Sequence, residues 1–360
     1  MKSVGIFTFH RALNYGAVWQ CWALKTTCEN LGYAVQTIDY NPWGHYTYVG
    51  CLRHRPNVAY RNTKMLYLFN RFVAKHLNLT PHSESHDYMV QNPPQFDVCI
   101  VGSDTVWAKD VVGDFIYPYL FDFLSPSSKR ISYAASLGGG GKMIDNQRVR
   151  NLMENFSSIS VREKQSVAQL LTMTDKPILD VCDPTMLISQ EQYMTMEQSV
   201  FGLPHRYIVF FDLAGDSFSI ECVKAIQKIL NIPVINLVGN YLSWAKRNIL
   251  APSPEQFLYV MRNAEFICTN SFHGTAFATI FRRPFICVEV KQGGRAKSNG
   301  RVTNLLQQTG LLSQYITDIQ DIPNRLHIDY PSIESDIQTY RQRSLSWLQS
   351  ALSFNESNKK

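Results

Sequence analysis

The feature of this 360-residue chain that most constrains its fold is the alternation of short apolar runs with stretches of helical period. In the first half, apolar runs at residues 3–9, 33–40 and 96–104 are separated by stretches whose apolar residues recur every three or four positions. Strands that alternate with helices in this way form βαβ units with parallel strands. The run VCIVG at residues 98–102 is apolar throughout, as expected for a strand that is buried on both faces of a sheet.

The same rhythm returns after a polar, Met- and Gln-rich stretch at residues 189–200. Strands are predicted at 207–212, 233–239, 265–269 and 284–290, with helices at 217–230, 254–263 and 275–281. In the first half, helices are predicted from Ala17 to about Leu31 and after a cap at Asn62 or Thr63. The chain therefore predicts an α/β protein with two Rossmann-like, doubly wound domains facing a cleft. The domains are residues 1–188 and 189–333, and a helix within 334–360 is expected to pack back on the first domain.

Composition argues against several other classes of protein. The chain is 45% apolar and 18% charged, as in ordinary globular proteins. It contains no apolar stretch of about 18 residues that could span a membrane. The N-terminal apolar run ends at His10 and Arg11, too early for a signal peptide. The eight cysteines form no CxxC pair, so we expect buried free thiols in a reducing compartment rather than zinc sites or disulfides.

The net charge of +6 is unevenly placed, since no acidic residue occurs between Asp39 and Glu84. Within that span, residues 51–77 are basic and rich in aromatic residues, and they include Arg53, Arg55, Arg61, Lys64, Arg71 and Lys75. Such a stretch suits an anionic membrane surface or nucleic acid, and the plain alternative is a solvated helix face. Nothing else in the chain resembles a nucleic-acid module, so no nucleic-acid partner is predicted.

Polar residues that directly follow predicted strands are the candidates for chemistry, because ligands bind α/β sheets at the carboxyl ends of the strands. They are Asn14 and Gly16, Ser103, Asp104 and Trp107, the glycines at 138–141, Arg162, and Ser271, His273 and Gly274. Each group has a structural alternative: a tight turn, a helix cap, a flexible connector, an ion pair between Arg162 and Glu163, or a buried structural histidine.

These residue types can together hold and transform an anion. Arg162 is expected to point into the cleft, where a guanidinium can bind carboxylate or phosphate bidentately. Asp104 can act as a general base toward a hydroxyl. His273, placed just before a helix that starts near Thr275, can donate to an anion or transfer protons near neutral pH. A later glycine-containing loop adds Lys291, Arg295, Lys297 and Arg301.

Six segments of the chain together resemble the polysaccharide pyruvyl transferase family. They are NYGAVWQCWAL, FDVCIVGSDTVW, ISVRE, DPTMLI, TNSFHGTAFATIFRRPF and GRVTNLLQQTGL, and they match in order and approximate spacing over residues 4–312. The resemblance implies a GT-B-like fold, with the acceptor on the first domain and the donor on the second. It implies transfer of a pyruvyl group from phosphoenolpyruvate to a sugar as a cyclic ketal. The acceptor it implies is a galactose-type residue of a lipid-linked capsular or exopolysaccharide unit in the bacterial cytoplasm.

The resemblance also suggests roles for individual residues. His273 and Asp104 become the catalytic acid and base, with either assignment open, and Arg162, Ser271, Gly274, Arg295 and Arg301 become donor-binding residues. Asn14, Gly16, Ser103 and Trp107 are placed at the acceptor side or elsewhere in the cleft. This chain has SFHG where many members carry Arg before the His, so phosphate binding is expected to rest on Arg162, Arg295 or Arg301.

No metal and no cofactor are expected beyond phosphoenolpyruvate as co-substrate, and segment 51–77 is expected to contact the inner membrane face. Three alternatives stay open. One is a GT-B glycosyltransferase that uses a nucleotide sugar. Another is a non-catalytic, sugar-binding subunit of a polysaccharide biosynthesis complex. The third keeps the fold but uses another donor or acceptor.

Overall fold

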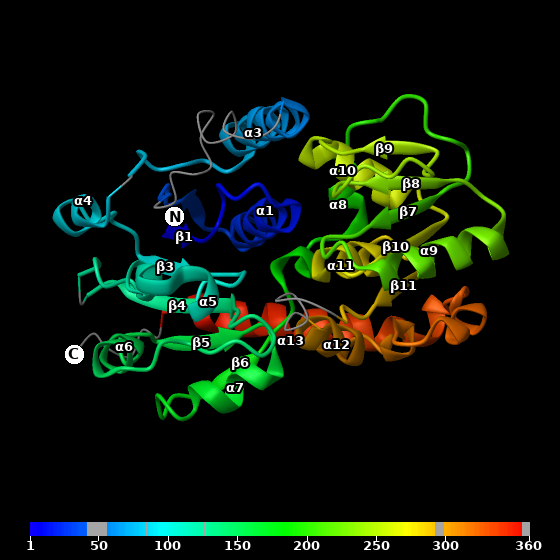
Figure 1. Cartoon of the computed structure of the whole chain (residues 1–360). Coiled ribbons are helices and arrows are strands. Elements are labelled where there is room, and N and C mark those ends of the chain that lie inside the picture. The colour runs from blue at the N-terminus through cyan, green and yellow to red at the C-terminus, as the bar shows by residue number, and fades with distance from the viewer. Residues whose placement is uncertain (42–55, 84, 126, 292–298, 355–360) are drawn as a thin grey trace.

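Two α/β domains, each built on a six-stranded sheet, make up the protein (Figure 1). The computed structural model describes residues 1–41, 56–83, 85–125, 127–291 and 299–354. All recorded pairings between strands of these sheets are parallel, and helices cover the sheets. The predicted fold class, two doubly wound domains, is thereby confirmed.

The sheet of the first domain has the strand order β2-β1-β3-β4-β5-β6. Its strands are β1 (Ser3–Phe7), β2 (Ala34–Thr37), β3 (Val98–Val101), β4 (Lys129–Ala135), β5 (Ser158–Val161) and β6 (Ile178–Asp180). The accompanying helices are α1 (Tyr15–Asn30), α3 (Pro56–His76), α4 (His86–Gln91), α5 (Lys109–Val112), α6 (Gln147–Met153) and α7 (Lys164–Leu170). In the central register, Val4 of β1 pairs with Val35 on one side and Val98 on the other. All four residues of β3 are buried, as its continuous apolar sequence predicts.

The sheet of the second domain has the order β12-β11-β10-β7-β8-β9. Its strands are β7 (Ile208–Phe211), β8 (Val234–Leu237), β9 (Arg247–Ile249), β10 (Phe266–Thr269), β11 (Phe285–Val288) and β12 (Tyr315–Ile316). Its helices, with the short α8 of the linking segment, are α8 (Gln190–Met194), α9 (Ser217–Leu230), α10 (Pro254–Arg262), α11 (Phe272–Ile280) and α12 (Asn299–Gln308). The short edge strands β9 and β12 were not among the predicted strands.

Two predicted helix starts are wrong, and the reasons are local. Helix α3 begins at Pro56, so Asn62 and Thr63 lie inside it and do not cap it. Helix α11 begins at Phe272, three residues before the predicted start, because the Ser271 hydroxyl accepts a hydrogen bond from the Gly274 N–H and caps the helix there.

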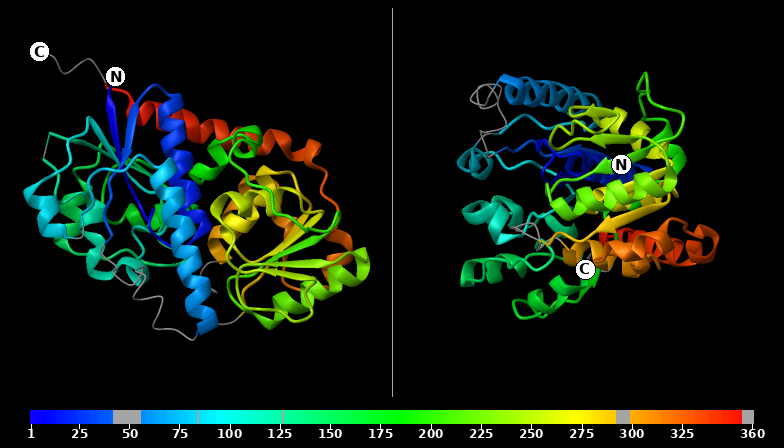
Figure 2. Two further views of the ribbon diagram at one scale, coloured as in Figure 1. Left: turned by 90° about the horizontal axis from the view of Figure 1, so that it is seen from above. Right: turned by 45° about the vertical axis from the view of Figure 1, so that its right-hand side comes forward.

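The last helix, α13 (Tyr330–Leu352), returns from the second domain to the first (Figure 2, left). The Cys182 N–H donates to the Ser344 hydroxyl over 2.8 Å, and the Tyr33 hydroxyl donates to the Leu352 carbonyl over 3.2 Å. Buried side chains of α13, among them Leu348, join the large core that also contains β1 and α1 residues. The chain therefore crosses between the domains twice.

The seven cysteines in the described part of the chain are all free and buried, which fits their prediction as core thiols. Within the same residues, no helix has both the length and the apolar character needed to cross a bilayer.

Candidate active site

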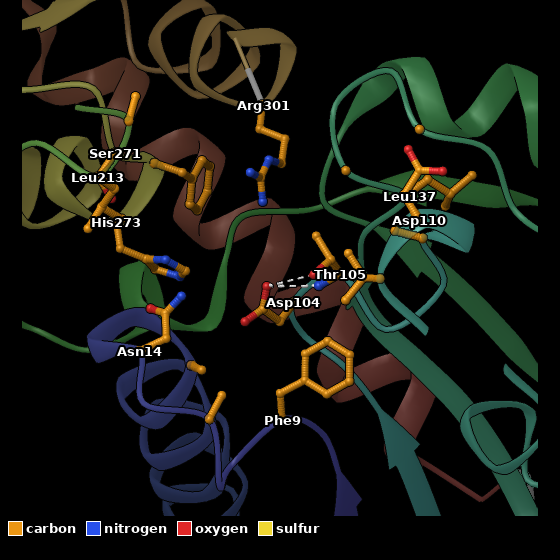
Figure 3. A pocket seen from close by; sticks show the side chains of 18 of the residues that line it. Phe9, Asn14, Asp104, Thr105, Asp110, Leu137, Leu213, Ser271, His273 and Arg301 are labelled. Atoms are coloured by element: carbon orange, nitrogen blue, oxygen red, sulfur yellow. Dashed lines mark hydrogen bonds between the residues drawn. The ribbon is translucent and has the colours of Figure 1, made fainter. Parts of the chain in front are cut away.

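A cavity of about 410 Å³ lies between the two domains, where the carboxyl ends of both sheets face each other (Figure 3). Its walls are made of residues that follow strands within a few positions. On the first domain these are Phe9 after β1, Asp104 after β3 and Leu137 after β4; on the second they are Leu213 after β7, Ser271 after β10 and Val290 after β11. This is the position at which α/β sheets bind ligands.

His273 lines the cavity from the first turn of α11, and its side chain is buried, with 9% exposed. Its ring rests against Gly16 of the first domain so closely that a Cβ at Gly16 would lie 1.9 Å from Nδ1. The Nε2 atom lies 3.6 Å from Asp183 Oδ2 and has no hydrogen-bond partner. The ring of a second-domain residue is thus held between two parts of the first domain. Gly16 serves the site by admitting this ring.

Asp183 is the residue that links these groups, and sequence reasoning missed it. Its Oδ2 accepts hydrogen bonds from Arg162 Nη1 (2.9 Å) and Ser103 Oγ (3.2 Å), while Oδ1 accepts from the Thr185 N–H and hydroxyl. Burial alone would raise the pKa of Asp183, but His273 and Arg162 outweigh that effect and hold the pKa below its usual range. The signal that could have found it is its place just after β6, the same rule that selected Asp104.

Arg162 does not point into the open cleft as predicted. It is 1% exposed, and it lies behind the cavity wall, where its guanidinium stacks 4.4 Å from the centre of the Phe272 ring. Asp183 binds Nη1, Glu163 lies 3.6 Å from Nε, and Asp104 lies 3.8 Å from Nη2. Burial would lower the pKa of Arg162, but Asp183 and then the other two carboxylates raise it. Its Nε and Nη2 atoms are buried without a hydrogen-bond partner.

Arg301 approaches the same cavity from the opposite wall. It belongs to α12, and Figure 3 shows its guanidinium pointing into the cavity toward Asp104. Its Nε is buried without a hydrogen-bond partner, and among the described residues no carboxylate lies within ion-pair distance. Burial, and after it the charge of Arg162, lower the pKa of Arg301. An anion bound in the cavity would act in the opposite direction and raise the pKa of Arg301.

Asp104 occupies a wall of the cavity with 10% of its side chain exposed. Its backbone has a φ of 80°, a region that residues other than glycine rarely adopt, and its Oδ1 accepts from the Thr105 N–H over 2.8 Å. Non-glycine residues held in this region are often found at functional sites.

The N-terminal end of α11 also lines this cavity, through Ser271, Phe272 and His273. The backbone N–H groups of Phe272 and His273 have no hydrogen-bond partner in the described part of the chain, since the Ser271 cap takes only the Gly274 N–H. Free N–H groups and the helix dipole make such an end favourable for an anion.

The remaining predicted site residues divide into three groups. Asn14 lines the cavity and also caps α1, its Oδ1 accepting from the Gly16 N–H. Ser103 and Trp107 do not line the cavity: Ser103 donates to the Ala134 carbonyl, and Trp107 is fully buried and donates to the Tyr119 carbonyl. Arg295 and Lys297 lie outside the described residues.

Two of the four predicted loop glycines, Gly138 and Gly141, line the cavity, and Gly274 is buried in the first turn of α11. In the part of the chain that the structure describes, no three His, Cys, Asp or Glu side chains are placed to hold a metal ion.

The fold and the position of this cavity define a two-domain protein of the GT-B class. The UDP-GlcNAc 2-epimerase of Neisseria meningitidis, solved with UDP-GlcNAc, is similar with a TM-score of 0.52 and 10% identity, covering 98% of this chain and 99% of that one. An α-glucosyltransferase solved with UDP is similar with a TM-score of 0.51 and 9% identity, covering 97% and 95%. The S. aureus MnaA–UDP structure has a TM-score of 0.51 and 12% identity, covering 96% and 91%. At these identities the likeness shows the fold alone.

The sequence itself identifies the family more narrowly. The model of the polysaccharide pyruvyl transferase family matches residues 14–292, most of the chain. The chain belongs to the polysaccharide pyruvyl transferase family. A comparison with curated proteins gives no match.

Proposed function

We propose that the protein transfers the pyruvyl group of phosphoenolpyruvate to a sugar, forming a cyclic ketal and releasing phosphate. The observation that carries the proposal is a pair of buried, unpartnered side-chain nitrogens in the wall of one cavity, Nε of Arg301 and Nε2 of His273. Buried polar atoms are nearly always paired in folded proteins, so such a set favours a bound anion. Membership of the family supplies the transferase class.

Phosphoenolpyruvate carries a phosphate and a carboxylate on a small carbon frame, so its site needs several cationic groups close together. In the proposal, Arg301 and the free N–H groups of Phe272 and His273 hold the phosphate. Arg162 lies beneath Phe272 with its charge balanced by three carboxylates, and it contributes by holding Asp183 in place. Ser271 and Gly274 contribute by shaping the end of α11, and Arg301 takes the place of the arginine that this chain lacks before His273.

His273 and Asp104 are the proposed acid and base. A proton is added to the methylene carbon of the donor, and a sugar hydroxyl attacks the adjacent carbon and loses its proton to the base. The bond between that carbon and the phosphate oxygen then breaks, and a second hydroxyl attacks the same carbon and gives up its proton to the released phosphate. We assign His273 as the acid because an imidazole can carry a proton near neutral pH, while a carboxylate starts as a base. Asp183 acts as a positioning residue for the ring.

The acceptor is proposed to bind against the first-domain wall, where Asn14, Thr105 and Asp110 provide polar groups. A galactose-type residue of a lipid-linked oligosaccharide is the acceptor we propose, and the cytoplasm, where phosphoenolpyruvate is made, is the proposed location. No cofactor enters the scheme.

The proposal is tested by measuring phosphate release from phosphoenolpyruvate with a panel of aryl and lipid-linked sugars, galactosides first. Release should depend on the acceptor, and His273→Gln should lower kcat by about a hundredfold to ten-thousandfold while unfolding like the wild type. Lys228→Gln, an exposed change in α9, is the control and should leave kcat unchanged. Release that ignores the acceptor would contradict the assignment.

A second candidate is a glycosyltransferase that uses a nucleotide sugar, because structures of the same fold were solved with UDP or UDP-GlcNAc. Calorimetric titration separates the two: the pyruvyltransferase should bind phosphoenolpyruvate and lose that binding in Arg301→Gln. Tight binding of UDP without binding of phosphoenolpyruvate would favour the glycosyltransferase. Binding of sugar alone would favour a non-catalytic subunit.

A further inference from the structure

Helix α3 presents a continuous stripe of cations and tyrosines to solvent. The stripe consists of Tyr60, Lys64, Tyr67, Arg71 and Lys75, all exposed, with Tyr60 at 72% and Tyr67 at 57%. At about 100° per residue, these spacings of three and four place all five side chains on one face of the helix.

The opposite face of α3 is fixed to the body of the protein. Met65, Phe69, Phe72 and Val73 are buried in the main core, and Arg61 Nη1 donates to the Gly239 carbonyl of the second domain over 2.9 Å. Arg61, which the sequence placed with the other cations of this segment, therefore does not belong to the stripe. Because the inner face is packed, the stripe cannot turn inward, and it is a permanent part of the surface.

The charge of the stripe is not balanced nearby along the chain. No acidic residue occurs anywhere between Asp39 and Glu84, so α3 carries none. An ordinary solvated helix face mixes charges of both signs and seldom exposes two large tyrosines. Three cations interleaved with two tyrosines instead match the headgroup region of an anionic bilayer, where tyrosine rings reside and lysine and arginine meet lipid phosphates.

A segment with one further exposed aromatic residue lies on the same side of the molecule. The segment between α8 and β7 runs along the upper side of Figure 1, as α3 does, and both stay uppermost in the right panel of Figure 2. This segment carries Phe201, which is 97% exposed, and Arg247 Nη1 donates to the Phe201 carbonyl over 2.6 Å. A fully exposed phenylalanine on the same side of the molecule as a cationic helix is a feature that insertion into a lipid surface would explain.

From this arrangement we propose that the face made by the α3 stripe and the Phe201 segment docks on an anionic lipid bilayer. The association is peripheral and reversible, with Lys64, Arg71 and Lys75 at the phosphates and the aromatic rings at the level of the headgroups. The proposal is independent of the chemistry in the cavity, so it stands or falls without the pyruvyltransferase assignment.

The test is cosedimentation of the full chain with vesicles of phosphatidylcholine alone or mixed with phosphatidylglycerol. The wild type should bind only the mixed vesicles, and added salt should weaken the binding. Because each cation near the surface contributes about a fivefold factor, Lys64→Gln/Arg71→Gln/Lys75→Gln should lower the partition coefficient roughly a hundredfold. Tyr60→Ser/Tyr67→Ser and Phe201→Ser should each weaken binding without removing its salt dependence.

The matched control is Lys142→Gln/Lys224→Gln/Lys228→Gln, which removes the same charge from other exposed positions. It should bind the mixed vesicles like the wild type, and both triple variants should unfold at the same temperature. Equal losses in the two triple variants, or binding to neither vesicle type, would overturn the proposal. Tighter binding to single-stranded nucleic acid than to the mixed vesicles, lost in the α3 variant, would overturn it in favour of a nucleic-acid surface.

Discussion

Arg162 and Arg301 approach the same cavity from opposite domains, but their surroundings differ in charge. Three carboxylates lie within 4 Å of Arg162, which is fully buried, and their charge outweighs its own. Arg301 has no such partner in the described part of the chain, and Arg162 is the first charge that acts on it. The first-domain side is therefore balanced by the protein itself, while the second-domain side lacks an anion. The difference teaches that burial of a cation alone does not mark it as a ligand-binding group.

The largest expected effect comes from removing the balanced arginine. Arg162→Met leaves Asp183, Glu163 and Asp104 without their cation, and breaking one side of a buried ion pair costs about 3–5 kcal/mol. The free energy of unfolding, measured in urea, should fall by that amount. Arg150→Met, at the exposed ion pair with Asp145, is the control and should leave the free energy of unfolding almost unchanged. A loss for Arg162→Met no larger than that of the control would show that the three carboxylates do not depend on Arg162.

A smaller effect on stability is expected at the contact between Gly16 of the first domain and the His273 ring of the second. Gly16→Ala places a methyl group on the His273 ring, which must move. A displacement of about 1 Å from the reacting position can lower the rate about a hundredfold, so kcat should fall by that order. Stability should fall as well, and Gly16→Ala in a His273→Ala background should be tolerated, because the space is then empty. Equal destabilisation in both backgrounds would place the clash elsewhere.

Arg301→Gln should not destabilise the fold, in contrast to Arg162→Met. Because Arg301 has no carboxylate partner, its loss should leave the unfolding temperature unchanged or raise it. The lost charge-assisted hydrogen bonds to the donor amount to about 1.5–3 kcal/mol, so KM for phosphoenolpyruvate should rise about tenfold to a hundredfold. Steady-state kinetics and thermal unfolding with and without inorganic phosphate measure both effects. Stabilisation by phosphate that survives in the variant would move the anion site away from Arg301.

The smallest effect is the pH dependence that Asp183 contributes. Its pKa is lower in the folded protein than in the unfolded chain, so its contribution is present above about pH 4 and is lost as the pH falls further. The slope from this one group cannot exceed about 1.4 kcal/mol per pH unit. Unfolding titrations between neutral and acid pH should therefore be steeper for the wild type than for Asp183→Asn. Parallel curves would mean that this carboxyl is not ionised more readily in the folded state.

Much of this architecture follows from local sequence. The short apolar runs, such as that of β3, and the helical periods between them predicted a parallel sheet in each domain. The rule that ligands bind after strands selected Asp104, Ser271 and His273, which line one cavity. The short edge strands β9 and β12 were missed because two or three residues carry no period. The start of α11 was missed because the Ser271 cap was not recognised as one.

The electrostatics of the site could not be predicted in the same way. Arg162 is covered by Phe272, a residue more than a hundred positions later, and nothing local to Arg162 announces that contact. Asp183 acquires its role only because β6 ends beside β5 and brings the carboxylate to Arg162 and His273. Charge balance in the cleft depends on contacts between residues that are far apart in the sequence, so local sequence patterns do not predict it.

The return of α13 to the first domain has a consequence for how the protein is made. The core that α13 shares with β1 and α1 includes Tyr340, Leu348 and Leu352, which are translated after strands β7 to β12 of the second domain. Domains generally fold in the order of synthesis, the earlier one first. Here the earlier domain must wait for its last helix, while strands β7 to β12 of the later one are continuous in the chain. We expect the first domain to expose its α13-binding surface on the ribosome until α13 has been translated.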